Sequence, residues 1–484
     1  MEYGSDLIVR LLQDLGIEYV SLNPGSSIRG LHDSIVNYGG NRPQLILCCH
    51  EEIAVAVAHG YAKATGRPMA VLLHNVVGLQ HASMAILNAW ADRVPMLLLG
   101  GGGPLDVTQR LPWIEWVHTA QNQGELVRDY VKWEEQPASL AAVPEAILRA
   151  YRIAMTEPKG PVYVCFDKEI QERRLDPAIS VPPVERYAPP CPPQADPRAL
   201  EAAAEMLVKA RGPVIVADRL GRNPEATAAL ADLAQLLAAP VLDRLGRFNL
   251  PSNHPLNLTG AEAEILPEAD LLLALDVQDL YGAVAPLELR ARGPLLKEGA
   301  TVIHISLTDL SLRSWWGGDC RRLFPVDLPI MADTKVALPA LVALVHERLA
   351  GQEDRRERLA HLQARHEALR RRWWESARKV WEAKPVAPAR LAAEVWEVIQ
   401  PLQEEWVLAN TTIGDWARRL WPLTRPHQWT GGSEAAGLGF GIGGSIGVAL
   451  AHRGAGRLCI DLQGDGDLLY TPGALWTAAN LQLP

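Results

Sequence analysis

Short apolar runs alternate with longer amphipathic stretches over the first 180 residues. The runs predict strands at residues 17–22, 45–49, 69–73 and 95–99. Strands that alternate with helices in this way predict stacked βα units and a parallel sheet. The turns that follow the strands cover residues 23–27, 50–52, 74–78 and 100–104. Ligands of open α/β sheets bind at the edge where strands finish, so we expect a site among these turns.

The same alternation starts again beyond residue 212 and once more beyond residue 388. Here the runs predict strands at residues 214–217, 240–242, 271–275, 302–305, 406–409 and 458–462, and a helix at 224–238. A proline-rich segment, residues 182–197, predicts a semi-rigid linker that closes the first domain. The central segment has no Gly-x-Gly-x-x-Gly after its first strand, which disfavours a nicotinamide dehydrogenase.

Residues 351–383 are dense in Arg and Glu and include the run Arg370-Arg371-Arg372-Trp373-Trp374. A basic and aromatic run of this kind is compatible with nucleic-acid binding, but the intermixed glutamates favour a solvated linker helix. The formal net charge of −9 also disfavours a nucleic-acid partner, which calls for a basic face.

Composition limits the remaining classes of protein. The chain starts without a basic segment followed by a long apolar run, and no stretch approaches 18 uninterrupted apolar residues. We therefore expect a cytoplasmic protein without a membrane partner. The cysteines at positions 48, 49, 165, 191, 320 and 459 have no Cys-x-x-Cys spacing, so we expect them to be buried small side chains.

The helix predicted at residues 50–66 opens with Glu51 and Glu52 and continues almost wholly in small apolar residues. Two glutamates in a first turn either stabilise the helix as solvated anions, or one of them is buried away from water and takes part in catalysis. A His-Glu-x-x-His zinc site is excluded, because Ala54 stands where the second histidine would be. His74, which follows the third strand, is either structural or catalytic, and its shared edge with Ser26 and Glu51 favours catalysis.

The last segment carries a glycine-rich stretch, residues 431–447, and Gly464-Asp465-Gly466 after its final strand. Closely spaced glycines let the backbone approach a ligand or another helix. An Asp between two glycines forms either a simple turn or a site for a hard cation with a diphosphate. Thr411 and Thr412 follow the strand at 406–409, where their hydroxyls suit a phosphate or a helix cap equally well.

Taken together, these motifs resemble the thiamine diphosphate-dependent enzymes of the acetolactate synthase and benzoylformate decarboxylase group. The resemblance spans nearly the whole chain and rests on Asn23-Pro24-Gly25-Ser26, residues 50–66, Leu73-His74, Asn88-Ala89-Trp90, Pro161-Val162-Tyr163, Asn253-His254-Pro255-Leu256, Gly437-Leu438-Gly439-Phe440, Gly464-Asp465-Gly466 and residues 474–479. It implies an α/β protein with three doubly wound parallel-sheet domains, the third incomplete. These would be a pyrimidine-binding domain at 1–180, a central domain at 190–349, a linker helix at 350–386 and a diphosphate-binding domain at 387–484.

The resemblance also implies roles for single residues. Glu51 would bond the ring nitrogen of the aminopyrimidine of thiamine diphosphate, so that a ylid forms and attacks a 2-oxo acid. Leu438 would hold the cofactor in a bent shape, and the carbonyl of Ala436 would take its amine. Asp465 would bind Mg²⁺ between Gly464 and Gly466, with Thr411 and Thr412 as further diphosphate contacts. His74 and Ser26 match the benzoylformate decarboxylase pattern as proton relay and substrate-carboxylate contact, which favours decarboxylation over acetolactate synthase-like carboligation.

Two departures from the family stand out. The stretch 276–281 has no histidine, whereas benzoylformate decarboxylase takes a second active-site histidine from its central domain. The chain also stops at Pro484, before the asparagines that complete the metal site in the family, so we expect a fragment of a longer enzyme; a non-catalytic homologue is the alternative. The residues do not decide whether the central domain binds FAD. The resemblance implies a homodimer or homotetramer, with Glu51 and Asp465 of one site on different chains.

Overall fold

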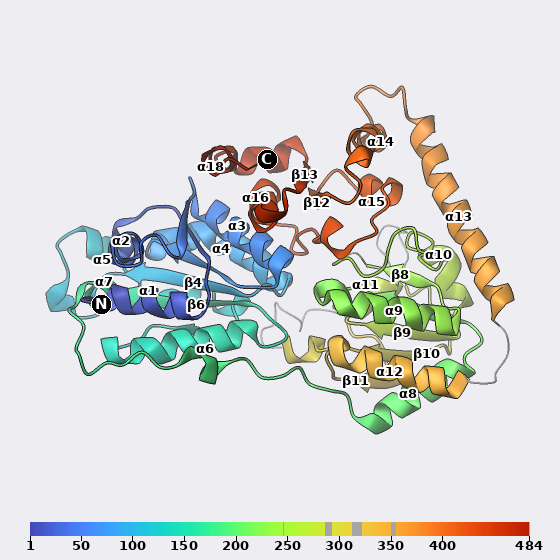
Figure 1. The fold of residues 1–484 in the computed structure, drawn as a ribbon, viewed down its shortest axis with the longest axis horizontal. Helices are drawn as coiled ribbons and strands as arrows, with labels where there is room; N and C mark the ends of the chain where they lie inside the picture. The colour runs from blue at the N-terminus through green and yellow to red at the C-terminus, as the bar shows by residue number, and fades with distance from the viewer. Residues whose placement is uncertain (245, 286–292, 312–321, 350–354, 484) are drawn as a thin grey trace. The chain divides into compact units, whose positions relative to one another are not determined.

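The computed structural model describes residues 1–244, 246–285, 293–311, 322–349 and 355–483. These residues form two compact units (Figure 1). The first unit contains residues 1–190 and 432–484, and the second contains the described residues between 191 and 431.

The first unit is built on a parallel sheet with the strand order β2-β1-β3-β4-β6-β5. The strands are β1 (Tyr19–Leu22), β2 (Gln44–Leu47), β3 (Met69–Leu73), β4 (Met96–Gly102), β5 (Glu134–Glu135) and β6 (Pro161–Asp167). The predicted parallel sheet is confirmed, and β3 has the predicted bounds. The apolar alternation did not mark β5, which is only two residues long.

Helices cover both faces of this sheet, so its strands are apolar on either side. The helices are α1 (Gly4–Asp14), α2 (Arg29–Asn37), α3 (Glu51–Thr65), α4 (Val76–Ala91), α5 (Ile114–Val117), α6 (Val143–Met155) and α7 (Lys168–Glu172). One core lies between the sheet and α1, α2 and α6, and the other lies between the sheet and α3 and α4. The carboxyl ends of β1, β3 and β4 therefore meet at one edge of a rigid layer.

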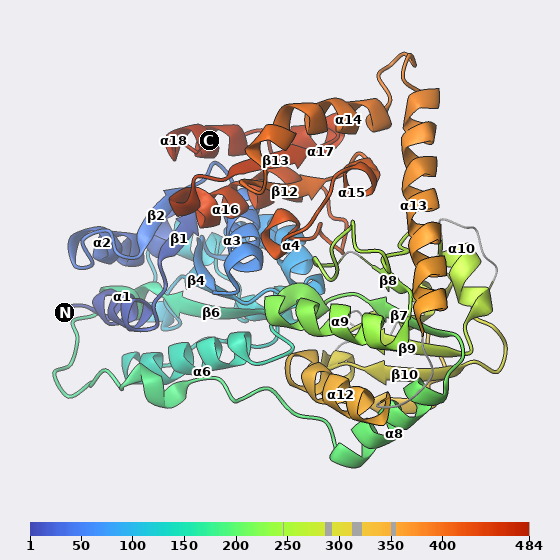
Figure 2. The same cartoon turned by 45° about the vertical axis from the view of Figure 1, so that its right-hand side comes forward.

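Helix α16 (Phe440–His452) packs on α3 in the same unit, and the two lie side by side in Figures 1 and 2. Glycines make this approach close: a Cβ on Gly60 would overlap the carbonyl oxygen of Gly444, and a Cβ on Gly447 would overlap that of Val57. The small residues of α3 thus serve the close packing that the sequence predicted.

The second unit is built on another parallel sheet, with the order β11-β10-β9-β7-β8. Its strands are β7 (Pro213–Ala217), β8 (Val241–Asp243), β9 (Leu271–Leu275), β10 (Thr301–Ile305) and β11 (Leu328–Ile330). Its longer helices are α8 (Pro197–Lys209), α9 (Pro224–Leu237), α12 (Thr334–Leu349) and α13 (Arg356–Lys379). Figure 2 shows α13 as a long helix at the edge of this unit. The predicted second α/β unit is confirmed.

Residues of the predicted third domain belong to both units. The second unit holds α14 (Pro388–Ile399), β12 (Trp406–Thr411) and α15 (Trp416–Leu420). The first unit holds α16, β13 (Leu458–Leu462), α17 (Asp465–Tyr470) and α18 (Ala474–Asn480). The division of the chain into three domains stays a prediction.

Two of the cysteine predictions are wrong. Cys48 and Cys165 are buried, but Cys49 and Cys191 are exposed, because the first lies just beyond β2 and the second lies in the proline-rich linker. Cys320 lies outside the described residues.

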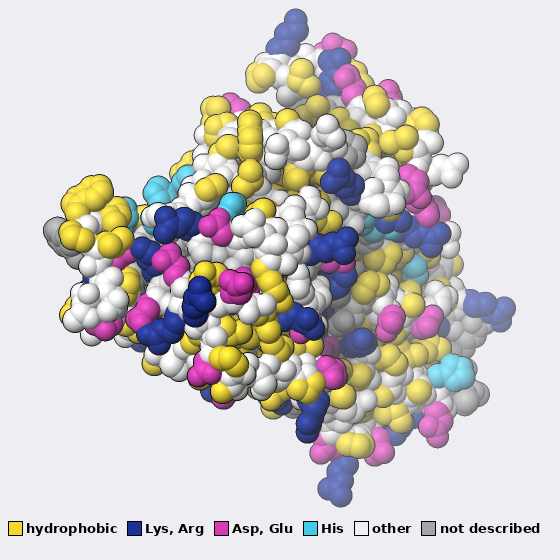
Figure 3. All heavy atoms as spheres, turned by 60° about the vertical axis from the view of Figure 1, so that its left-hand side comes forward, with side chains coloured by type: hydrophobic (Ala, Val, Ile, Leu, Met, Phe, Trp, Pro, Cys, Tyr) yellow, Lys and Arg dark blue, Asp and Glu magenta, His cyan; other side chains and the backbone are white. Residues whose placement is uncertain are grey.

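On the face drawn in Figure 3, acidic and basic side chains are interspersed, and those of the described residues do not gather into a basic stripe. Among the described residues, no helix is long and apolar enough to cross a membrane.

Candidate active site

Glu51 is the first residue of α3 and is only 6% exposed. The preceding residue, His50, is extended, and its ring nitrogen accepts the Glu52 N–H, which fixes the start of the helix. The Glu51 carboxylate makes no hydrogen bond to any described residue. A Cβ on Gly78 would lie 3.1 Å from Glu51 Oε1 and 2.9 Å from His74 Cβ, so Glu51 and His74 meet over this glycine.

His74 follows β3 and is held by Ser27 rather than by Ser26. Ser27 is buried, its Oγ lies 2.8 Å from His74 Nδ1, and the same Oγ accepts the Asn75 N–H at 2.9 Å. The tautomer of His74 sets which of the two atoms donates in the Ser27–His74 bond, and a neutral ring that accepts at Nδ1 carries its proton on Nε2. Gly25 makes room for this ring, since a Cβ there would lie 2.7 Å from it.

Ser26 is exposed at the start of a 3₁₀ turn, Ser26–Ile28. Its predicted contact with the substrate carboxylate stays a prediction. Neither the turn nor α2 has a side-chain cap, and the Ser27 hydroxyl bonds His74 instead.

A second histidine, His118, stands beside His74. Their ring centroids are 5.7 Å apart and the rings are edge to face at 79°. Burial lowers the pKa of His74 most, His118 lowers it further, and the Glu51 carboxylate opposes both by raising it. His118 follows α5, in a stretch where the apolar pattern predicts neither strand nor helix, so no pattern along the chain indicated its place.

A second pair of histidines, His50 and His81, lies near the start of α3. The rings of His50 and His81 have centroids 4.7 Å apart. Burial and His81 lower the pKa of His50, and Glu51 raises it. Glu51 therefore interacts electrostatically with one histidine of each pair, His50 and His74.

Leu438 is held between two glycines whose backbones are fixed. Asn88 on α4 donates to the Gly437 carbonyl and accepts the Gly437 N–H, both at 3.1 Å. Asp467 accepts the Gly439 N–H at 2.6 Å, and Thr471 donates to the Gly439 carbonyl at 3.0 Å. The Leu438 side chain remains 47% exposed. A large apolar side chain displayed from a fixed loop is suited to support a ligand.

The residues before Leu438 are fixed in the same way. Asp92 Oδ1 accepts the Glu434 N–H at 2.9 Å, one helical turn beyond Asn88. Ala436 is exposed and has a φ of 53°, a left-handed conformation that costs free energy for a residue with a Cβ. Such strain is typical of ligand-binding loops.

Gly464, Asp465 and Gly466 form the start of α17. Gly464 precedes the helix, and the exposed Asp465 accepts the Gly466 N–H at 2.9 Å. Within the described ranges, no group of three or more His, Cys, Asp or Glu side chains is placed to hold a metal ion. Asp465 as a metal ligand therefore stays a prediction.

Thr411 and Thr412 belong to the second unit, at the end of β12. The Thr411 hydroxyl donates to the Gly414 carbonyl at 3.2 Å, and Thr412 is exposed. Their contact with a diphosphate stays a prediction.

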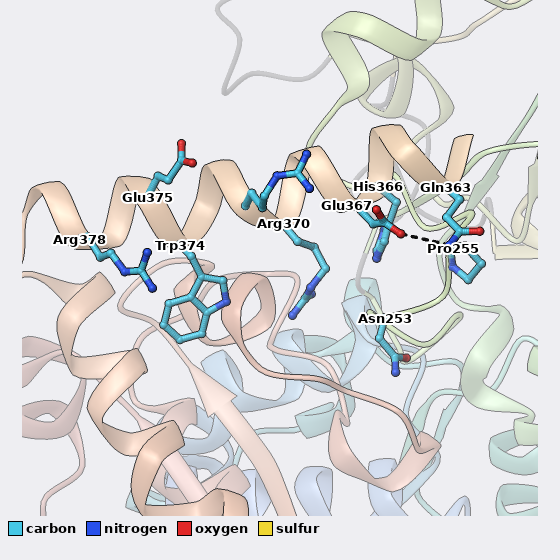
Figure 4. A pocket seen from close by; sticks show the side chains of 10 residues that line it. Asn253, Pro255, Gln363, His366, Glu367, Arg370, Trp374, Glu375 and Arg378 are labelled. Carbon is cyan, nitrogen blue, oxygen red and sulfur yellow. Dashed lines mark hydrogen bonds between the residues drawn. The ribbon is translucent and has the colours of Figure 1, made fainter. Parts of the chain in front are cut away.

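The second unit has a cavity of about 700 Å³ along α13 (Figure 4). Arg370, Trp374 and Arg378 point to one side of the helix there, and Glu375 points to the other. Arg370 donates to the carbonyls of Ser252 and Leu420, at 3.4 and 3.3 Å, and burial lowers its pKa. The basic and aromatic run thus has a structural use within the unit, where Arg370 joins α13 to the turn at Ser252 and to the end of α15.

Three parts of the chain match known domains of one enzyme family. Residues 3–127, 200–341 and 410–484 match the family models of the thiamine pyrophosphate enzymes: the N-terminal TPP binding domain, the central domain and the C-terminal TPP binding domain. The acetolactate synthase large subunit of Haemophilus influenzae is 25% identical, over 99% of this chain and 80% of that protein. Benzoylformate decarboxylase of Pseudomonas aeruginosa is 26% identical, over 98% of this chain and 83% of that protein.

A solved structure shares the fold. The crystal structure of benzoylformate decarboxylase from Polynucleobacter necessarius superposes with a TM-score of 0.77 at 20% identity, over all of this chain and 84% of that one.

Proposed function

Because this chain belongs to the thiamine pyrophosphate enzyme family, we propose that it decarboxylates a 2-oxo acid in the manner of benzoylformate decarboxylase, with thiamine diphosphate and Mg²⁺. The observation that carries the proposal is the meeting of Glu51 and His74 over Gly78. It joins a buried carboxylate to a histidine of lowered pKa at the carboxyl edge of the sheet.

The residues present fit this cofactor. Asn75 Oδ1 and His118 Nδ1 are buried near Glu51 and His74 without a hydrogen-bond partner among the described residues. Buried polar atoms are rarely left unsatisfied, so these atoms mark a place for a polar ligand. The exposed Leu438 offers an apolar support for a ring.

When bound, thiamine diphosphate supplies a carbon nucleophile and takes up the electrons that decarboxylation releases. The part of Glu51 is to share a proton with the aminopyrimidine ring, and its burial keeps water from taking that proton. The part of His74 is to hold and move a proton at the substrate, with Ser27 fixing its ring. Leu438 would support the cofactor with its exposed side chain, and the carbonyl of Ala436 would accept a hydrogen bond from its amine.

For the diphosphate end, we propose Asp465 as the ligand of Mg²⁺, with Gly464 and Gly466 letting the backbone approach. Thr411 and Thr412 are the further contacts. A carboxylate oxygen is the ligand type that Mg²⁺ prefers.

The second candidate is carboligation of the acetolactate synthase kind. It is favoured by the acetolactate synthase relative, whose identity of 25% is close to that of the decarboxylase. When CO₂ leaves, an electron pair remains on the oxo carbon. In carboligation this pair forms a bond to the carbon of a second oxo substrate, whereas in simple decarboxylation it takes up a proton. The presence of His74, a histidine of lowered pKa, at the site supports the proton transfer that ends decarboxylation.

The test is to supply the chain with thiamine diphosphate, Mg²⁺ and either benzoylformate or pyruvate. We expect release of CO₂ and an aldehyde, and loss of both in Glu51→Gln by a factor on the order of 10²–10⁴. The matched control is Glu145→Gln, which removes an exposed carboxylate on α6. Acetolactate as the product would favour carboligation. Absence of turnover with these and related oxo acids would refute the proposed function.

We also propose that the working unit is a homodimer or homotetramer. In this structure α16 lies on α3 of the same chain, so a site shared between chains needs a direct test. Mixing inactive Glu51→Gln with inactive Asp465→Asn, followed by dissociation and reassociation, restores up to about a quarter of the activity only if each site takes residues from two chains. No recovery indicates that one chain supplies both residues.

A further inference from the structure

The loop that carries His118 is fixed to the sheet. Lys168 on α7 forms an ion pair with Glu115 at 3.0 Å, and Glu115 accepts the Leu111 N–H. Thr119, next to His118, donates to the Glu115 carbonyl. Further along, Gln123 donates to the Gly101 carbonyl at 3.0 Å and to the Tyr163 hydroxyl at 2.6 Å. The position of His118 is thus determined on both sides.

Glycines at the end of β4 allow this loop to come close. A Cβ on Gly103 would overlap the Thr119 hydroxyl, and one on Gly101 would lie 2.5 Å from the Ser27 carbonyl. The same strand end therefore admits both the segment that holds His74 and the segment that carries His118. The run of glycines at 100–103 has a specific use at the site.

His118 does not serve a structural hydrogen bond through Nδ1, which is buried and without a partner in the described part of the chain. Its ring is set edge to face on His74 instead. The groups that face His74 are the Ser27 hydroxyl, His118 and Glu51, with Gly25 and Gly78 making room.

The proposed reaction needs a proton donor at this place. In the overall step, R–CO–COO⁻ and one proton give R–CHO and CO₂: the bond from the oxo carbon to the carboxylate breaks, and a bond from that carbon to hydrogen forms. The proton comes from a side chain that water reloads. The central stretch 276–281 supplies no histidine for this purpose.

We propose that His118 is the second histidine of this active site, a positioning residue that acts through His74 and controls how readily His74 gives up the proton that replaces CO₂. This inference rests on the proposed function. A proton on His118 disfavours one on His74, and the Glu51 carboxylate favours it, so the two side chains adjust His74 in opposite directions.

The test is to follow the histidine side chains of the full-length chain by NMR during a pH titration, without cofactor. His118→Gln keeps a hydrogen-bonding group and His118→Phe keeps the ring. We expect both to raise the pKa of His74, and Glu51→Gln to lower it. His32→Gln, which changes an exposed side chain beside Asp33 on α2, should leave it unchanged. With cofactor and 2-oxo acid, both His118 variants should lower kcat/KM about tenfold to hundredfold and move the alkaline limb of its pH profile upward, since His74 must carry the proton that it gives up.

Titration of His74 that is the same in wild type and in both His118 variants would overturn the inference, provided the variants keep the wild-type unfolding temperature. If a variant does not fold, the other serves. Wild-type chain that turns over no oxo acid, while the NMR shifts occur as expected, would instead refute the proposed function and leave only the coupling of the two rings.

Discussion

The side-chain amide of Asn88 is paired with the backbone of Gly437 through two hydrogen bonds of 3.1 Å, one donated and one accepted. The two residues are 349 positions apart in the sequence. The pairing fixes the loop that displays Leu438 to the helix that follows His74 and Asn75, so the apolar support and the polar edge of the site belong to one rigid unit.

Asn88→Ala should loosen this loop. The substitution leaves the Gly437 N–H and carbonyl without their partner, at a cost of about 1–3 kcal/mol in the free energy of unfolding. Because Leu438 then loses its fixed position, we expect weaker binding of thiamine diphosphate, measured by calorimetry. Asn88→Asp keeps the acceptor and loses the donor, and should fall between wild type and Ala. Equal affinity in all three would contradict the role assigned to the pair.

Gly60→Ala should disrupt the packing of α3 on α16. Alanine is normally the better helix former by up to about 1 kcal/mol, but here its Cβ meets the Gly444 carbonyl, and overpacking costs about 1–3 kcal/mol. We expect a net loss of stability in urea unfolding. Gly454→Ala is the control, since a Cβ there meets nothing within 4 Å. A stability gain in Gly60→Ala would show that the helices are not in this contact.

The buried His366 and the half-buried His254 of the second unit should make its stability depend on pH. Burial is the main cause that lowers the pKa of both His254 and His366 below the ordinary value of about 6.5. As the pH falls below that value, the unfolded chain binds protons before the folded chain does, so stability decreases with acidification.

His366→Gln should reduce that dependence. The imidazole forms a hydrogen bond with the Asn257 carbonyl at 2.7 Å, so the substitution lowers stability at every pH. The readout is therefore the slope of the unfolding free energy against pH, between about pH 7 and 5. His361→Gln, an exposed change on the same helix, should keep the wild-type slope. A steeper slope in His366→Gln would show that the sign is wrong.

Asp465→Asn should weaken the Mg²⁺-dependent part of cofactor binding. The neutral amide loses the charge that attracts the ion, and we expect the affinity for thiamine diphosphate in the presence of Mg²⁺ to fall on the order of tenfold. Calorimetry with Mg²⁺ and with EDTA separates the Mg²⁺-dependent part of cofactor binding from the part that needs no metal. Asp33→Asn, an exposed change on α2, is the control. Identical Mg²⁺ dependence in wild type and Asp465→Asn would remove Asp465 from the metal site.

The sequence by itself determined the parallel α/β architecture and the family, whereas it left Glu51 as either a solvated anion or a buried group, and the fold decided for burial. The architecture and the family follow from local patterns, since a strand or a helix is recognised by the spacing of apolar residues within a few turns. The bounds of β3, β9 and β13 agree with the apolar runs to the residue.

Only the tertiary structure decided which serine holds His74, that His118 stands beside it and that Asn88 pairs with Gly437. Ser26 and Ser27 are adjacent and chemically alike, and the 3₁₀ turn that directs the second one inward depends on glycines in another strand. His118 lies in a segment without periodicity, placed by contacts with β4, β6 and α7. Contacts between residues distant in the chain leave no periodic trace in it, which is why only the folded arrangement revealed them.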